Sequence, residues 1–358
     1  MDLLQSLLLS LLSPMVLAFL LGIAATLVRS DLKIPEQLQA ALTIYLLFAI
    51  GLKGGAKLDG VVLADFARPL AAAMGLCLAI PVWTYAILWR VGRLSPADAA
   101  ALAAHYGSVS VVTFGACLAF LDARGVTHEG FLPALLAVME VPAIIVALYL
   151  AGLAKNPAVL RPLGATGFVP AAWPGLRPGV LRELLTSKGL VLLLGGMAIG
   201  LLSGKKGYDQ VAPLFDAPFR GVLTIFLLEI GLVTGRRLSD LKSAGPFLCG
   251  FAIIMPFLHG LLGVWLGHWA GLGIGGATVL GTLAASASYI AAPAAVRVAL
   301  PEANPALYLT ASLAITFPFN VVIGIPAYLT GGRRFAHHNR RRAHHQSANA
   351  AHARGEQT

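Results

Sequence analysis

Charged residues are scarce in this chain of 358 residues, where Asp, Glu, Lys and Arg together make up 12%. A soluble protein carries about 25% charged residues, so the composition excludes an ordinary soluble domain. Hydrophobic residues make up 58%, and the mean hydropathy is +0.80. The apolar residues form long blocks separated by loops, which is typical of a polytopic membrane protein.

Cysteines and enzyme motifs are also lacking. Cys77, Cys117 and Cys249 lie in apolar blocks without the spacing of a disulfide framework or a metal site. The sequence contains no His-Glu-x-x-His, no phosphate-binding Gly-Lys-Ser/Thr loop and no nucleophile elbow. We therefore expect no enzyme, no cofactor and, beyond a basic tail, no feature that binds nucleic acid.

The apolar blocks predict ten membrane-spanning helices. A helix needs about 20 residues to cross a bilayer, and most of the blocks approach or exceed this length. The expected spans lie near residues 7–28, 37–52, 67–90, 97–121, 131–153, 188–203, 218–234, 245–270, 274–299 and 305–330.

The second half of the chain repeats the first. Matching features recur in the same order at a nearly constant offset, which a chance match in apolar sequence does not produce. They are residues 42–47 and 223–228 (Leu-Thr-Ile-Tyr/Phe-Leu-Leu), the Ile-Gly-Leu triplets at 50–52 and 230–232, Pro81 and Pro256, Pro142 and Pro318, and two Ser-x-Ser pairs.

Each repeat holds five expected spans, and this odd number inserts the second repeat from the opposite side of the membrane. The predicted fold class is an all-α polytopic membrane protein with two inverted five-helix repeats. Its fourth and ninth helices are expected to be broken and to cross at the midplane. The expected parts are residues 1–153, a linker at 154–187, residues 188–330, and a basic, disordered tail at 331–358 that is rich in His and Arg.

The Ser-x-Ser pairs lie in the middle of the fourth and ninth spans, where an unpartnered polar group is costly. Gly107 and Gly115 flank the first pair and Pro293 follows the second, and such residues release backbone groups from a helix. The N–H groups at a helix N-terminus bind anions. The expected substrate-binding residues are Gly107, Ser108, Val109, Ser110, Ala285, Ser286, Ala287 and Ser288.

Ionisable residues within the spans are few, and such residues are functional candidates. Glu140 precedes Pro142, whereas Thr316 and Asn320 flank Pro318 at the matching place in the other repeat. These oxygen-bearing side chains suit a coupling cation, either Na+ or a proton. The expected cation-coupling residues are Thr113, Glu140, Tyr289, Thr316 and Asn320.

The charges of the loops predict the orientation. With the N-terminus outside, the inner loops hold thirteen Lys and Arg residues and the outer loops hold seven. Positive residues favour the cytoplasmic side, so we expect both termini outside and the 154–187 linker in the cytoplasm. The six tail arginines then lie outside as well.

Several motifs resemble the sodium-dependent bicarbonate transporter family, first associated with cyanobacterial carbon uptake. The likeness covers residues 14–330 approximately, and Tyr289 stands where cyanobacterial members carry an acidic residue. The motifs are Tyr106–Thr113, Met139–Ala143, Pro256–Gly260 and the run from Ala284 to Pro318.

The resemblance implies a homotrimer in a bacterial inner membrane, each protomer with a mobile core domain and a gate domain. It also implies bicarbonate and Na+ sites at the broken helices and a PII-like regulator on the cytoplasmic face. We therefore predict a Na+-dependent bicarbonate symporter surrounded by membrane lipid. Two alternatives stay open: a Na+- or H+-coupled transporter of an organic anion such as a monocarboxylate, and a membrane sensor that binds an anion without transporting it.

Overall fold

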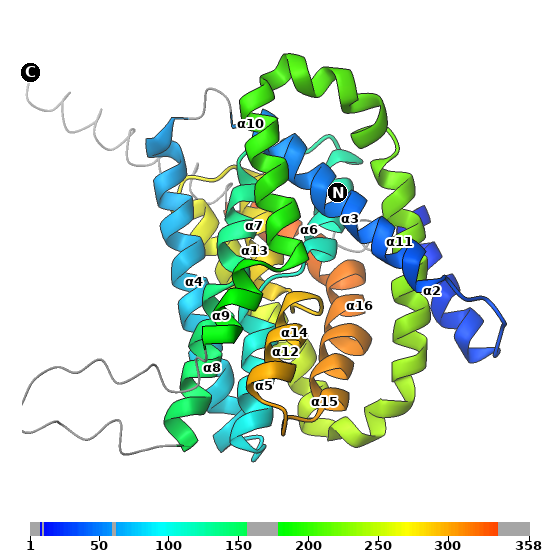
Figure 1. Cartoon of the computed structure of the whole chain (residues 1–358), viewed down its shortest axis with the longest axis vertical. Helices are drawn as coiled ribbons and strands as arrows, with labels where there is room; N and C mark the ends of the chain where they lie inside the picture. Colours follow the sequence, from blue (N-terminus) through cyan, green and yellow to red (C-terminus); the bar gives the residue numbers. More distant parts are fainter. Residues whose placement is uncertain (1–7, 9–10, 59–61, 156–177, 336–358) are drawn as a thin grey trace, which may run out of the picture.

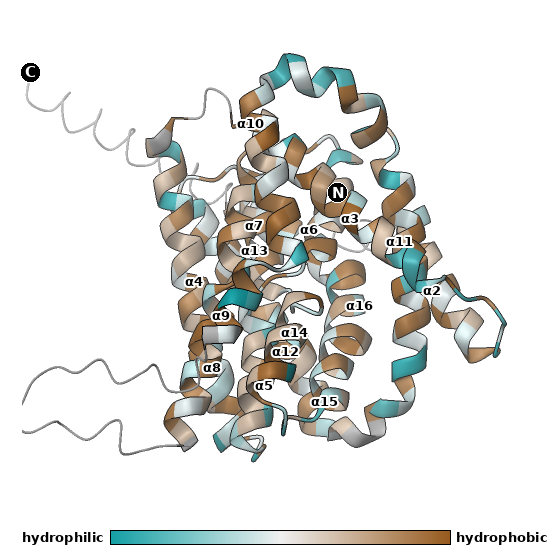
Figure 2. Cartoon of the chain, viewed as in Figure 1, coloured by the Kyte–Doolittle hydropathy of each residue, from teal (hydrophilic) through white to brown (hydrophobic). Residues whose placement is uncertain are grey.

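The computed structural model describes residue 8 and residues 11–58, 62–155 and 178–335, and every structural statement below concerns these residues. They form helices and no strand, as predicted. The last 23 residues of the expected tail, 336–358, and residues 156–177 of the expected linker lie outside the described residues. Figure 2 shows apolar helices through the body of the molecule, with hydrophilic residues mostly toward the helix ends.

The helices follow one another with short connections. Their bounds are α2 (Pro14–Leu27), α3 (Glu36–Ala56), α4 (Leu63–Arg90), α5 (Pro96–Gly107), α6 (Val111–Asp122), α7 (Leu132–Glu140), α8 (Pro142–Lys155), α9 (Pro178–Leu185), α10 (Lys188–Phe215), α11 (Phe219–Arg237), η2 (Leu238–Asp240), α12 (Leu241–Trp269), α13 (Ile274–Ala285), α14 (Ala291–Ala299), α15 (Pro305–Leu309), η3 (Thr310–Thr316), α16 (Phe317–Phe319) and η4 (Asn320–Gly324).

Seven helical segments of the described chain are long and apolar enough to cross a membrane. Some of them join two of the helices named above end to end. They are Glu36–Ala56, Ala64–Arg90, Pro96–Asp122, Leu132–Ala154, Lys188–Phe215, Ala244–Trp269 and Pro305–Phe335. The apolar helices α2 and α13 are shorter. The fold is thus an all-helical membrane fold with seven candidate spans.

Two stretches differ from the boundaries expected from the sequence. Residues 178–185 of the expected linker form α9, whose Val180 and Leu184 are buried because its apolar face packs against α14 and α10. Residues 331–335 of the expected tail continue the last helix, and the carbonyl of Gly332 accepts a hydrogen bond from His268 at 2.9 Å.

The helices fall into two groups by their contacts. In the first, which we name the scaffold group, α10 packs along α3 and α11 packs along α2. The second, the core group, contains α4 to α8 and α12 to η4, in which α12 packs on α13 and α5 on α4 and α8. Figure 1 shows α2, α3 and α11 on one side of the molecule and α4 and α8 on the other.

Glycines allow the scaffold helices to approach closely. A Cβ atom at Gly51 or Gly55 of α3 would collide with the backbone carbonyls of Leu193 or Met197 on α10. A Cβ atom at Gly231 of α11 would collide with the backbone of α2 in the same way. Small residues at such crossings bring helix backbones into contact within a membrane, where no hydrophobic effect drives helices together.

Adjacent glycines on α10 provide a test of this packing. A Cβ atom at Gly196 would lie 2.9 Å from the carbonyl oxygen of Phe48, whereas no described atom lies within 4 Å of one at Gly195. We expect Gly196→Ala to destabilise the protein by about 1–3 kcal/mol through overpacking. Gly195→Ala is expected to be neutral or slightly stabilising. Thermal unfolding in detergent measures both, and equal melting temperatures would contradict the close α3–α10 contact.

Candidate functional site

The first helix break lies at the Ser108–Ser110 pair. Helix α5 ends at Gly107, and Ser108 is extended, with φ −86° and ψ 167°. Ser110 is the N-cap of α6, and its Oγ accepts a hydrogen bond from the N–H of Thr113 at 3.2 Å. Serine favours this position because its hydroxyl replaces a missing helix carbonyl. The first Ser-x-Ser therefore ends one helix and begins another.

The second break has the same design but is longer. Helix α13 ends at Ala285, and Ser286 is extended, with φ −77° and ψ 162°. The next helix, α14, begins only at Ala291, so the break spans 286–290, whereas the first spans 108–110. The Oγ of Ser288 accepts a hydrogen bond from the N–H of Ala292 at 3.2 Å. Tyr289 and Ile290 follow Ser288 within the break.

The two breaks hydrogen-bond to each other. The N–H of Ser110 donates to Ser286 Oγ at 2.9 Å, and the N–H of Ser288 donates to the carbonyl of His105 at 2.8 Å. Ser286 Oγ in turn donates to the carbonyl of Leu283 at 2.8 Å. All of these residues are buried. Each break thus satisfies backbone groups that the other leaves without a helical partner.

A void of about 10 Å³ lies beside the joined breaks. Ser110 and Ser288 line it, together with Val111 at the start of α6 and Ala291 at the start of α14. The first N–H groups of a helix have no intrahelical acceptor and carry partial positive charge. Two helix N-termini therefore meet at this void, an arrangement that favours an anion.

Glu140 also lines the void, at the end of α7. It is 3% exposed, and its Oε2 has no hydrogen-bond partner among the described residues. Gly189 faces it from the N-terminal turn of α10, and a Cβ atom there would lie 2.9 Å from Glu140 Oε1. The core group thus presents a buried carboxylate to the scaffold group. The sequence offered no signal for Gly189.

Other residues predicted for the substrate lie around the breaks in different ways. Val109 lines the void, whereas Ser108 Oγ donates to the carbonyl of Glu140 at 2.7 Å. Ala285 and Ala287 are buried on either side of Ser286. Gly107 passes close to Pro81 and Ala143, where a Cβ atom would come within 2.9 Å of each. Ser286 acts on the site through Ser110.

The predicted cation residues are not all together. Tyr289 lines the void with Glu140, and Thr113 Oγ1 donates to Ser110 Oγ at 3.0 Å. The described residues that line the void do not include Thr316 or Asn320. Thr316 donates to the carbonyl of Ala252 at 2.7 Å, and Asn320 Nδ2 donates to the carbonyl of Ala285 at 2.7 Å. Both side chains hold the second break from behind.

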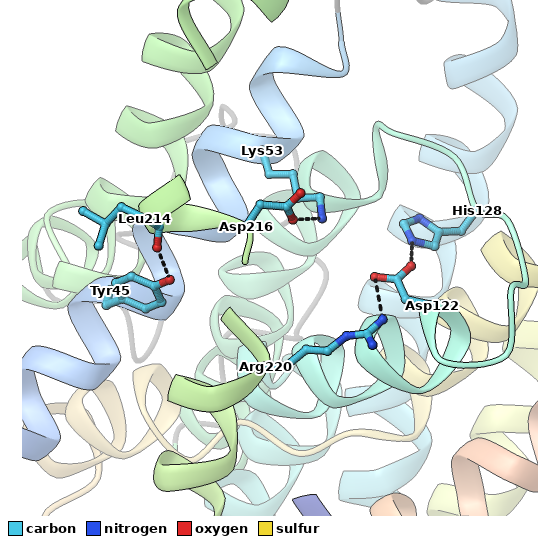
Figure 3. A network of polar contacts seen from close by, with 7 residues as sticks. All are labelled: Tyr45, Lys53, Asp122, His128, Leu214, Asp216 and Arg220. Atoms are coloured by element: carbon cyan, nitrogen blue, oxygen red, sulfur yellow. Dashed lines mark hydrogen bonds and ion pairs between the residues drawn. The ribbon is translucent and has the colours of Figure 1, made fainter. Parts of the chain in front are cut away.

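A cavity of about 690 Å³ lies between the two groups near Lys53, and we name it the Lys53 cavity. Figure 3 shows the polar residues around it, with Lys53 paired to Asp216 at 2.5 Å. Asp122 of the core group lies 3.2 Å from His128 and 3.9 Å from Arg220 of the scaffold group. The sequence analysis did not single out these residues. Their only signal was a set of charges at the expected ends of spans.

The chain matches a family model described as the Na+-dependent bicarbonate transporter superfamily over residues 14–332. No curated protein matches the chain.

The hydrogen bond from Ser110 to Ser286 can be tested by removing its acceptor. Ser286→Ala leaves the buried N–H of Ser110 without a partner, which costs about 1–3 kcal/mol. Ser312→Ala is the control, because the Ser312 hydroxyl is also buried but donates to the carbonyl of Tyr308 in its own helical segment at 2.7 Å. We expect the larger fall in melting temperature for Ser286→Ala. Equal falls would contradict a role for Ser286 in joining the breaks.

Proposed function

This chain belongs to the Na+-dependent bicarbonate transporter superfamily, and from that premise we propose that it is a Na+-coupled symporter of bicarbonate. The family match confirms the resemblance predicted from the motifs, and membership of a transporter superfamily indicates a non-enzymatic function. The proposed substrate site is the void beside the joined breaks. Its proposed residues are those predicted from the sequence around Ser108–Ser110 and Ser286–Ser288.

The observation that carries this proposal is that the void combines groups for an anion with a carboxylate. The N-termini of α6 and α14 and the hydroxyls of Ser110 and Ser288 suit an anion. Ionised Glu140 would repel that anion and would itself be a costly buried charge. A cation at Glu140 removes both penalties, so each ion favours the binding of the other.

The size of the void favours a small anion over the organic-anion alternative. A volume of about 10 Å³ holds about one water molecule, so even a small polyatomic anion needs the surrounding side chains to move apart. A monocarboxylate with an apolar body needs a far larger displacement. Tyr289 and Glu140 are proposed to lie nearest to the coupling ion, with Thr113, Thr316 and Asn320 holding the breaks in place.

Equivalent features support the proposed inverted repeats. Helices α5 and α13 each have 12 residues and end before an extended serine, and Ser286 follows Ser108 by 286 − 108 = 178 positions. Left-handed backbone conformations recur at Arg93 (φ 53°) and Gly271 (φ 92°), again 271 − 93 = 178 positions apart.

The contacts between the halves are also reciprocal. In the proposed numbering of ten spans, the second packs on the sixth (α3 on α10) and the seventh packs on the first (α11 on α2). Glu129, before the fifth span, accepts a hydrogen bond from the N–H of Gly273 at the start of the ninth at 2.7 Å. Asp98, at the start of the fourth, accepts one from the N–H of Asn304, before the tenth, at 2.7 Å. Exchanging the repeats interchanges these contacts.

The orientation is proposed from the loop charges, with both termini outside and the linker in the cytoplasm. Topology reporters fused after Lys155 and after Arg333 are expected to report opposite sides of the membrane. The same side for both would contradict five spans in the second half. The homotrimer, the PII-like regulator and the bacterial inner membrane remain predictions from the resemblance.

Uptake of labelled bicarbonate into proteoliposomes, with and without an inward Na+ gradient, tests the function. Stimulation by Na+ is expected. Gradient-independent uptake would contradict Na+ coupling, and binding without uptake would indicate the sensor.

Glu140→Gln tests the coupling within this assay. The amide keeps the shape but removes the charge, so the half-saturation for bicarbonate should lose most of its dependence on Na+. Glu229→Gln is the matched control, because Glu229 of α11 is also 3% exposed but lies away from the void. It should keep the dependence of the wild type. Normal Na+ dependence in Glu140→Gln, or a failure of that variant to fold, would assign a structural role to Glu140.

A further inference from the structure

Ile290 lies where three hollows of the protein meet. It lines the void at the breaks, and it lines a cavity of about 280 Å³ near Glu36 and Lys188, which we name the Glu36 cavity. It also lines a closely packed apolar pocket of about 10 Å³ together with Leu47 and Val111. Only Tyr289 and Ile290, among the described residues, line both the void and the Glu36 cavity.

The Glu36 cavity and the Lys53 cavity approach the void from opposite ends of the scaffold group. Residues Glu36 to Thr43 at the start of α3 line the first, whereas residues 49–57 around its end line the second. Ile50 and Phe219 separate the Lys53 cavity from the apolar pocket by lining both. The void is thus separated from the Glu36 cavity by the thin wall of Tyr289 and Ile290, and from the Lys53 cavity by the apolar pocket.

The two residues of the thin wall are held differently. The ring of Tyr289 packs edge-on against Phe317, with 5.8 Å between the ring centroids. Ile290 is the N-cap of α14, with φ −112° and ψ −58°, and it makes no side-chain capping hydrogen bond. Its branched apolar side chain offers no partner to water or an ion, and transfer of either past it is costly.

We propose that Ile290 is the barrier between the void and the Glu36 cavity, and that the size of its side chain determines whether a small polar solute reaches the void from that end. The assignment of the void as the substrate site rests on the proposed function. The barrier itself rests on the cavities alone, so it can be tested without transport.

The test measures the reactivity of a cysteine placed in the void. Ser110→Cys is purified in detergent, and its reaction with a cationic methanethiosulfonate reagent is timed against the parent, which corrects for Cys77, Cys117 and Cys249. Adding Ile290→Ala should raise the reaction rate several-fold, and Ile290→Phe should lower it. Ile290→Val, which removes one methyl group, should give an intermediate rate and serves if the alanine variant does not fold.

Two matched controls identify the wall. Ile230→Ala enlarges the Glu36 cavity, which Ile230 lines, without thinning the wall, because Ile230 is not among the described residues that line the void. Ile50→Ala thins the barrier at the opposite end. Both variants should react like the unmodified Ser110→Cys protein.

Equal rates for the Ile290 and Ile230 variants would overturn the proposal, and so would a rise confined to Ile50→Ala. The outcome for Ile290 is distinguishable from that of the proposed function. If the wild-type protein takes up no bicarbonate while Ile290→Ala still exposes the thiol of the Ser110→Cys protein, the barrier stands and the transport proposal fails.

Discussion

Hydrogen bonding between the two helix breaks is the constraint on which the rest of the structure depends. A helix that stops within an apolar interior leaves N–H and C=O groups unpaired, and each unpaired group costs several kcal/mol in lipid. Here the N–H of Ser110 finds Ser286 Oγ and the N–H of Ser288 finds the carbonyl of His105. Neither break is satisfied alone, so the two halves of the chain must fold onto each other.

The same breaks create the chemistry of the site. Ending α5 at Gly107 and α13 at Ala285 allows α6 and α14 to begin in the middle of the protein, with their N-termini at one void. Helix N-termini favour an anion there. Glu140 adds a carboxylate from a third helix, which makes occupation by an anion depend on a cation. A backbone requirement and an electrostatic one are therefore met by the same few residues.

The breaks are related but not identical, and their difference has consequences for access to the site. The second break is longer, and its additional length carries Tyr289 and Ile290 past the serine pair to the wall of the Glu36 cavity. The scaffold group, by contrast, is joined by backbone contacts at Gly51, Gly55 and Gly231, which leave little freedom between its helices. Changes in access are thus more readily accommodated between the groups and at the second break than within the scaffold.

The sequence by itself determined the membrane class, the family, and where along the chain the serine pairs and Glu140 lie, because hydropathy and short motifs are properties of consecutive residues. The tertiary structure decided which side chains share the void. Ser110 and Ser288 line it, whereas Ser108 turns to the carbonyl of Glu140 and Asn320 to that of Ala285. Gly189 meets Glu140 only because α10 packs beside α7. Periodicity cannot supply these facts, since the rotation of a side chain about a broken helix depends on where the helix ends and on neighbours distant in sequence.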